Sequence, residues 1–201
     1  MNRGRLLALE GLDGCGKSTQ IEPLADALRR AGHEVLATYE PTDGPHGRRI
    51  RELAHSRERV PPEEELRWFV EDRREHVAQV LEPALAAGRV VLTDRYYLSS
   101  VAYQGARGLD WGEILADSER EFPAPDLALL FEIDPAAGLA RVRARGAPVD
   151  DRFERPEFLA RVAEIFRALE CPYVVRIDAA SPVDAVSRAV RDAVRERLAL
   201  L

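Results

Sequence analysis

Short apolar runs alternate along the chain with longer segments in which apolar residues recur at helical spacing. The runs lie at 6–10, 35–39, 89–94, 127–134 and 174–177. The third and fourth are almost continuously apolar, as in strands that are covered on both faces. Alternation of this kind predicts a doubly wound α/β fold, with a five-stranded parallel sheet flanked by helices. Such sheets bind ligands beyond the carboxyl ends of their strands.

Three helices are predicted between and after these runs. The first follows a glycine-rich loop and continues through 27–33, a long amphipathic helix covers 63–87, and a closing helix covers 182–199. Pro83 is expected to kink the long helix, because proline lacks the N–H that an α-helix needs. Neither internal repeats nor low-complexity linkers occur, so we expect a single domain over 1–201.

Composition excludes several classes of protein. The chain is 46% hydrophobic and 32% charged, which is typical of a globular protein. Its net charge of −6 argues against sequence-independent binding of nucleic acid. No apolar run approaches the roughly 20 residues of a membrane span, and no signal-peptide pattern is present. Cys15 and Cys171 have neither disulfide nor metal-site spacing, so we expect a cytoplasmic protein.

One short motif carries the strongest chemical signal. Of the 29 lysine and arginine residues only Lys17 is a lysine, and it lies in GLDGCGKS at 11–18. This stretch fits the phosphate-loop pattern G-x-x-x-x-G-K-[ST], between a predicted strand and a predicted helix. Its amides and the helix N-terminus would cradle phosphates, Lys17 would bridge the β- and γ-phosphates, and Ser18 would ligate Mg²⁺. A guanidinium is too bulky for that ring of amides, which explains the lone lysine.

We therefore predict an ATP site rather than a glycine-rich turn with a chance lysine. Its predicted phosphate-binding residues are Gly11, Leu12, Asp13, Gly14, Cys15, Gly16, Lys17, Ser18 and Thr19. A GTPase would need a second lysine in its base-reading motif, and a motor usually needs a longer chain. A small nucleotide kinase fits best.

Signals for a second substrate follow the third strand, in TDRYYLSSVAYQGARGLD at 93–110. Asp94 could orient Mg²⁺ or accept a proton, and Arg95 could clamp a phosphate. The alternative is that the two side chains pair with each other at the strand end. Tyr96, Tyr97 and Tyr103 either pack in the core or border a sugar or base.

Two further segments each allow two interpretations. Phe69 and Arg73 lie four residues apart on one helical face, where they could stack a nucleobase and bind its carbonyl edge; the alternative is a core aromatic beside a solvated arginine. Residues 141–155 combine five arginines with glycine and proline. We predict a mobile lid there, at about 143–155, rather than a solvated charge run.

Together these motifs resemble those of the bacterial and archaeal thymidylate kinases, which phosphorylate dTMP with ATP. EGLDGCGKSTQ at 10–20, EPTDG at 40–44, the Phe69–Arg73 pair, the segment 94–110 and DRFE at 151–154 occur in family order over nearly the whole length. DRY…S…AYQG is the most specific element. The resemblance implies a P-loop kinase fold with a short lid.

The resemblance also implies roles for individual residues at the acceptor. Asp13 should approach the 3′-hydroxyl, Phe69 should stack on thymine, Arg73 should bind the thymine carbonyl and Arg95 should hold the phosphate. Tyr103 should crowd the 2′ position and so favour deoxyribose. The full set of acceptor residues implied is Asp13, Glu40, Pro41, Phe69, Arg73, Arg95, Ser100, Tyr103 and Gln104.

On the donor side, Gly14 occupies the loop position where some family members have a catalytic arginine. The chain therefore resembles the class that supplies this arginine from the lid, and Arg152 is our candidate. Arg143, Asp178 and Ala179 should border the adenine. The implied catalytic set is Lys17, Asp94, Arg95 and Arg152, with Mg²⁺ at Ser18 and Asp94. A homodimer packed through helices that include 63–87 is implied as well.

One position departs from the family pattern. Many bacterial members have an arginine where this chain has Tyr39, before Glu40 and Pro41. Either Arg48 or Arg49 compensates, or Arg95 carries more of the phosphate charge, or the acceptor differs from dTMP. The alternatives to a thymidylate kinase are a kinase for another pyrimidine nucleotide or a deoxynucleoside, and a regulatory protein that binds nucleotides without catalysis.

Overall fold

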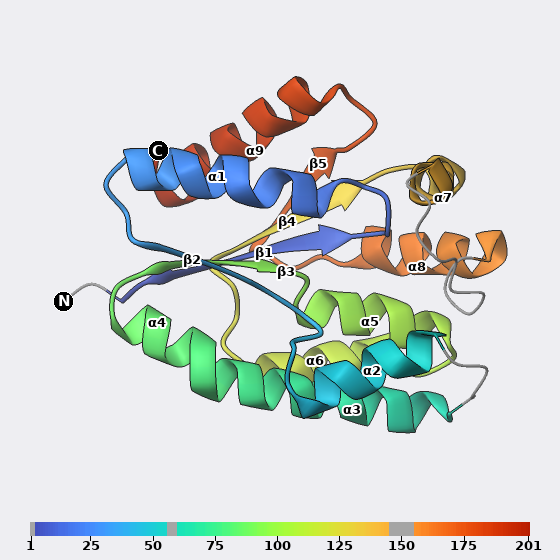
Figure 1. The fold of residues 1–201 in the computed structure, drawn as a ribbon. Coiled ribbons are helices and arrows are strands. Elements are labelled where there is room, and N and C mark those ends of the chain that lie inside the picture. The colour runs from blue at the N-terminus through green and yellow to red at the C-terminus, as the bar shows by residue number, and fades with distance from the viewer. Residues whose placement is uncertain (1–2, 56–59, 145–154) are drawn as a thin grey trace.

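A central sheet of parallel strands organises the molecule, whose computed structural model describes residues 3–55, 60–144 and 155–201. The strands follow the spatial order β2-β3-β1-β4-β5, which confirms the predicted α/β fold (Figure 1). Their bounds are β1 (Arg5–Gly11), β2 (Val35–Tyr39), β3 (Val90–Asp94), β4 (Leu127–Glu132) and β5 (Val174–Asp178).

Helices cover both faces of this sheet. They are α1 (Lys17–Arg30), α2 (Pro45–His55), α3 (Pro62–His76), α4 (Glu82–Ala86), α5 (Tyr97–Ala106), α6 (Trp111–Glu121), α7 (Pro135–Ala144), α8 (Pro156–Ala168) and α9 (Val183–Leu198). α1 and α9 pack on one face, and α4, α5, α6 and α8 pack on the other (Figure 1). Among the described residues, no helix has the length and apolar character of a membrane span.

The register of the sheet explains why the predicted site residues converge. Leu9 of β1 lies opposite Asp94 of β3, and Gly11 lies opposite Phe131 of β4. The three central strands therefore end close to one another, with β1 extending beyond the end of β3. Side chains that directly follow these strands meet at one edge, as the doubly wound topology predicts.

The long helix predicted over 63–87 is interrupted differently from our expectation. It consists of α3, a π-helical segment at Val77–Leu81 and α4. Pro83 lies in the first turn of α4 and cannot donate a hydrogen bond to the preceding turn. Directly before it, the Glu82 N–H donates to the Val77 carbonyl across a wider π-helical turn, so the interruption precedes the proline.

Helix α2 was missed by the sequence pattern because it offers few apolar positions between its arginines. Ile50 and Leu53 of α2 pack with Val60 and with Trp68 of α3 in a small cluster of their own. This cluster holds α2 against α3 beside the carboxyl end of β2.

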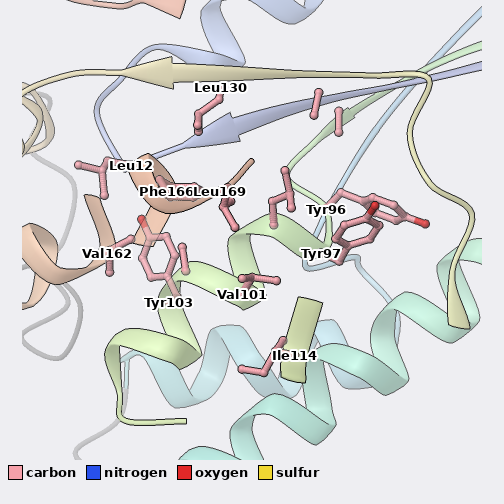
Figure 2. Packing of buried hydrophobic residues seen from close by; sticks show 14 of the residues in the cluster. Leu12, Tyr96, Tyr97, Val101, Tyr103, Ile114, Leu130, Val162, Phe166 and Leu169 are labelled. Carbon is pink, nitrogen blue, oxygen red and sulfur yellow. The ribbon is translucent and has the colours of Figure 1, made fainter. Parts of the chain in front are cut away.

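Tyr96, which directly precedes α5, and Tyr97 and Tyr103 of α5 are all core residues. Tyr96 and Tyr97 are fully buried with ring centroids 4.8 Å apart, and Figure 2 shows them side by side. The Tyr97 hydroxyl donates to the Tyr173 hydroxyl at 2.9 Å. The packing interpretation is thus right for Tyr97, whereas Tyr96 and Tyr103 also line a cavity described below.

Candidate active site

The phosphate loop, residues 11–18, connects β1 to α1. Gly14 and Gly16 have φ values of +79° and +98°, a region that glycine enters without steric cost. Lys17 is 5% exposed, and its Nζ donates to the carbonyls of Gly11 at 3.0 Å and Leu12 at 2.9 Å. The ammonium therefore lies inside the curve of the loop, as expected for a compact point charge rather than a wide guanidinium fork.

Helix α7 explains why no side chain is possible at position 14. A Cβ on Gly14 would lie 2.1 Å from the carbonyl oxygen of Gly138, and a Cβ on Gly138 would lie 2.9 Å from the carbonyl oxygen of Asp13. The two backbones are in direct contact. An arginine at position 14 would need α7 to move away, so Lys17 is the only cation that this loop supplies.

A hydroxyl and a carboxylate meet at the entrance to the helix. Ser18 Oγ donates to Asp94 Oδ2 at 2.5 Å. Within the described residues, no group of three or more His, Cys, Asp or Glu side chains could hold a metal ion alone. Mg²⁺ in nucleotide sites typically uses one or two protein oxygens together with phosphates and water, and the Ser18–Asp94 pair fits that mode.

Arg95 pairs with a residue other than Asp94, so the alternative of an Asp94–Arg95 ion pair is wrong. Its Nη2 donates to Asp13 Oδ1 at 2.5 Å and its Nη1 to Ser99 Oγ at 3.0 Å. Arg95 has a φ of 71°, a conformation that costs a non-glycine residue on the order of 1–2 kcal/mol. Burial lowers the pKa of Arg95, but the Asp13 carboxylate together with Tyr103, Asp94 and Glu10 outweighs this and raises the pKa well above its ordinary value.

Asp13 connects this arginine to α5. Its Oδ2 accepts a hydrogen bond from the Tyr103 hydroxyl at 3.1 Å. Desolvation raises the pKa of Asp13, but the charges of Arg95 and Lys17 and the Tyr103 hydrogen bond outweigh it, so the pKa is lowered. The carboxylate is thus ionised at neutral pH.

All the residues expected to bind the acceptor line one cavity of about 300 Å³, here called the base pocket. It lies between α2, α3 and α5, next to the phosphate loop. The expected residues in its lining are Asp13, Glu40, Pro41, Phe69, Arg73, Arg95, Ser100, Tyr103 and Gln104. The lining residues that sequence reasoning did not assign to the acceptor site are Ile50, Arg51, Tyr96 and Ser99.

Arg73 is buried rather than solvated, so the alternative interpretation of this residue is wrong. It is 1% exposed, its Nε donates to Glu40 Oε2 at 2.8 Å and its Nη2 donates to Ser100 Oγ at 3.0 Å. The second oxygen of Glu40 lies 3.0 Å from His76 Nδ1, and His76 Nε2 lies 2.8 Å from Thr38 Oγ1. This network holds the guanidinium in one orientation.

Two buried polar atoms of the base pocket stand out. Among the described residues, Arg73 Nη1 and Gln104 Oε1 are the buried side-chain atoms without a hydrogen-bond partner. Buried polar atoms are nearly always paired. One of these atoms is a donor and the other an acceptor, so the pocket is complementary to a ligand that offers an acceptor and a donor in turn.

The structure shows what surrounds the position where Tyr39 replaces arginine. Tyr39 is 47% exposed, and its hydroxyl donates to the Asp43 carboxylate. Arg48 Nη1 donates to the Asp43 carbonyl at 2.5 Å, and the Arg49 guanidinium lies 3.7 Å from the centroid of the Trp68 ring. Neither arginine lines the base pocket, so the structure gives no support to the first of the three alternatives for Tyr39.

Arg51, which sequence reasoning missed, lines the base pocket instead. Its Nη1 donates to the Pro41 carbonyl at 2.7 Å, and its Nη2 donates to Asp43 Oδ1 at 2.8 Å. Without a predicted helix over α2, the sequence offered no means of judging which of its arginines faces the site.

Glu10 was also missed, although an acidic residue within an apolar strand is a signal in itself. It is 0% exposed and accepts hydrogen bonds from Tyr96 N at 2.9 Å, Ser99 N at 3.2 Å and Ser99 Oγ at 2.5 Å. Burial raises its pKa to about 7, partly offset by the hydrogen bond from Ser99. Glu10 therefore supports the loop that carries Arg95 and titrates near neutral pH.

The donor side opens into a second cavity, of about 620 Å³. The expected ATP-binding residues in its lining are Asp13, Gly14, Gly16, Lys17, Ser18 and Thr19. Leu12 and Cys15 are buried in the core beneath the loop.

The residues expected to border adenine lie outside this cavity. Asp178 ends β5, Ala179 is buried and Arg143 is exposed on α7. Arg141, two residues earlier, donates to the Ala179 carbonyl at 3.0 Å and is the arginine that contacts this loop. The catalytic candidate Arg152 and most of the expected lid, 145–154, lie outside the described residues.

Comparisons with known proteins agree with this geometry. A family model described as thymidylate kinase matches residues 9–190. The thymidylate kinase of Desulfotalea psychrophila is 47% identical over 198 residues, which are 98% of this chain and 97% of that protein. The thymidylate kinase of Xanthomonas campestris pv. campestris is 45% identical over 92% of this chain and 80% of its own length. That of Akkermansia muciniphila is 43% identical over 97% of this chain and 93% of its own length.

Proposed function

Since the chain belongs to the thymidylate kinase family, we propose that it transfers the γ-phosphoryl group of ATP to dTMP, giving dTDP and ADP. The observation that carries this proposal is the unpaired donor and acceptor in the base pocket, Arg73 Nη1 and Gln104 Oε1. Thymine offers a carbonyl oxygen and an adjacent ring N–H, which match them. Cytosine bound in the same orientation would place its amino group at Arg73 and its unprotonated ring nitrogen at Gln104, which leaves both atoms unpaired.

The rest of the acceptor fits around this pair. Phe69, half-buried in the wall of the base pocket, would stack on the ring. Arg95 and Arg51 would hold the phosphate, because guanidinium groups bind phosphate oxygens in pairs. Asp13 would bind the 3′-hydroxyl, and Tyr103 would occupy the space that a 2′-hydroxyl needs.

Catalysis in this site would consist mainly of positioning and charge neutralisation. The dTMP phosphate is already largely ionised at neutral pH, since its second pKa is about 6, so no strong general base is needed when its oxygen attacks the γ-phosphorus in line. Lys17 and the loop amides would hold the donor phosphates. Ser18 and Asp94 would hold Mg²⁺, which neutralises phosphate charge when bound.

A lid over about 143–155 completes the proposal. Arg152 would stabilise the charge of the transferring phosphoryl group, since the phosphate loop brings only Lys17. Closure of such a lid would exclude water and limit wasteful hydrolysis of ATP.

An acceptor panel tests the proposed function. ADP release with ATP and Mg²⁺ would be measured for dTMP, dUMP, dCMP and thymidine, and dTMP should give the highest kcat/KM. A higher value for another acceptor would make the chain a kinase for that acceptor. Tight binding of ATP without ADP formation with any acceptor would indicate a regulatory protein.

A further inference from the structure

The two polar atoms of the Gln104 side-chain amide have different surroundings. Its Nε2 donates to Glu65 Oε1 at 3.0 Å, while its Oε1 has no partner among the described residues. Gln104 and Glu65 are each 1% exposed. Gln104 lines the base pocket, and Glu65 does not, so the Gln104 amide is the group that connects Glu65 to a bound base.

Glu65 permits only one orientation of that amide. Its other oxygen accepts a hydrogen bond from Arg107 Nη1, and Arg107 Nη2 also donates to the Val60 carbonyl at 2.9 Å. A carboxylate paired with a guanidinium offers acceptors alone. A half-turn of the Gln104 amide would place two oxygen atoms against each other in a buried site and forfeit a hydrogen bond to a charged group.

We propose that Glu65 is a positioning residue that sets the base specificity of the pocket, by holding the oxygen of the Gln104 amide toward the base. This inference rests on the proposed function and explains how that function is made selective. An amide oxygen at this point accepts the ring N–H of thymine or uracil. It repels the unprotonated ring nitrogen of cytosine, which needs a donor there.

The Glu65→Gln variant tests this role. A glutamine at position 65 can donate as well as accept, so the Gln104 amide becomes able to turn and present its NH₂ to the base. The ratio of kcat/KM for dTMP to that for dCMP should fall by about tenfold or more, the range expected for one misplaced buried hydrogen bond. A merely structural role would lower both values and leave their ratio unchanged.

Two controls isolate the interaction. Glu63→Gln makes the same exchange at an exposed position of α3 and should leave the ratio unchanged. In a Gln104→Met background, which has no amide to orient, Glu65→Gln should cause no further change in the ratio. The proposal is overturned if Glu65→Gln leaves the dTMP-to-dCMP ratio of kcat/KM undiminished. It is also overturned if Glu65→Gln lowers this ratio as much in the Gln104→Met background as in the wild type.

A measurement on the unaltered protein covers the case in which Glu65→Gln fails to fold. The side-chain NH₂ protons of Gln104, assigned by comparison with Gln104→Met, should show stronger nuclear Overhauser contacts to Glu65 than to the base of bound dTMP. The reverse order of intensities would overturn the proposal. Absence of dTMP phosphorylation by the unaltered enzyme would instead refute the proposed function itself.

Discussion

At the scale of single residues, three ionisable side chains lie one after another between the loop after β3 and the base pocket. Glu10 lies beneath the loop after β3, Arg95 extends from that loop and Asp13 binds the outer end of Arg95. Burial favours the neutral form of Glu10, whereas Asp13 and Arg95 are kept ionised by the charged groups around them. The arrangement leaves a fixed cation next to the base pocket.

The raised pKa of Glu10, about 7 compared with an ordinary value of 4.5, predicts a pH-dependent stability. Between these values the folded protein keeps a proton that the unfolded chain has lost, so the free energy of unfolding decreases as pH rises through this window. The slope approaches about 1.4 kcal/mol per pH unit at most. Glu10→Gln should therefore gain stability relative to the wild type between about pH 5 and about pH 8, as measured by urea unfolding. Parallel stability curves would contradict this prediction.

The position of Lys17 predicts that charge alone is insufficient. Lys17→Ala should abolish turnover, and Lys17→Arg should lose roughly a hundredfold or more in kcat, because the wider fork cannot occupy the space between the loop carbonyls. The measurement is steady-state ADP release with dTMP. Arg30→Lys, an exposed exchange on the same helix, serves as the matched control. Near-normal turnover by Lys17→Arg would refute the size argument.

At the scale of elements, two helices that the sequence pattern did not delimit shape the site. α7 contacts the phosphate loop backbone to backbone at Gly138, and α2 carries Arg51 to the rim of the base pocket. Each helix contributes one residue to the site, and the position of that residue depends on how the whole helix is packed.

Gly138→Ala should impair catalysis. Its Cβ would lie 2.9 Å from the Asp13 carbonyl oxygen and displace the residue that binds Arg95, so kcat/KM for dTMP should fall. The backbone must shift to relieve this contact, which offsets the roughly 1 kcal/mol by which alanine is a better helix former than glycine, so the thermal midpoint should not rise. Ala140→Gly, at an exposed position of α7, should leave kcat/KM unchanged and lower the thermal midpoint. Wild-type kinetics in Gly138→Ala would show that the loop tolerates the contact.

Arg51 should compensate for Tyr39 in binding the acceptor phosphate. Arg51→Ala is expected to raise the KM for dTMP by about tenfold or more, as expected for loss of a charge-assisted hydrogen bond, with a smaller effect on the KM for ATP. Arg48→Ala, on the same helix but outside the base pocket, is the control. Equal effects of the two substitutions on the KM for dTMP would contradict a specific role for Arg51.

At the scale of the whole molecule, we expect the two faces of α3 to have different functions. Its inner face supplies Phe69 and Arg73 to the base pocket, and we propose that its outer face, together with α4, packs against a second copy of the chain. Light scattering should then give twice the 22.5 kDa of one chain. A mass of one chain at micromolar concentration would refute the dimer.

The sequence by itself determined the sheet and the phosphate loop, because both depend on local rules: apolar runs form buried strands, and GLDGCGKS forms a loop around an anion. The shared helical face of Phe69 and Arg73 follows from their spacing. The roles expected of the acceptor residues, including Gln104, came from the resemblance of the motifs to those of a family. Because residues that follow parallel strands meet at one edge, the convergence of the phosphate loop with Asp94 and Arg95 could also be predicted.

Only the tertiary structure decided which groups pair. Arg95 pairs with Asp13 rather than Asp94, Arg51 rather than Arg48 reaches the base pocket, and Glu65 orients an amide 39 positions away along the chain. Such choices depend on how helices far apart in sequence are rotated and packed against one another. No local pattern encodes that rotation, because it is set by the summed contacts of the whole core.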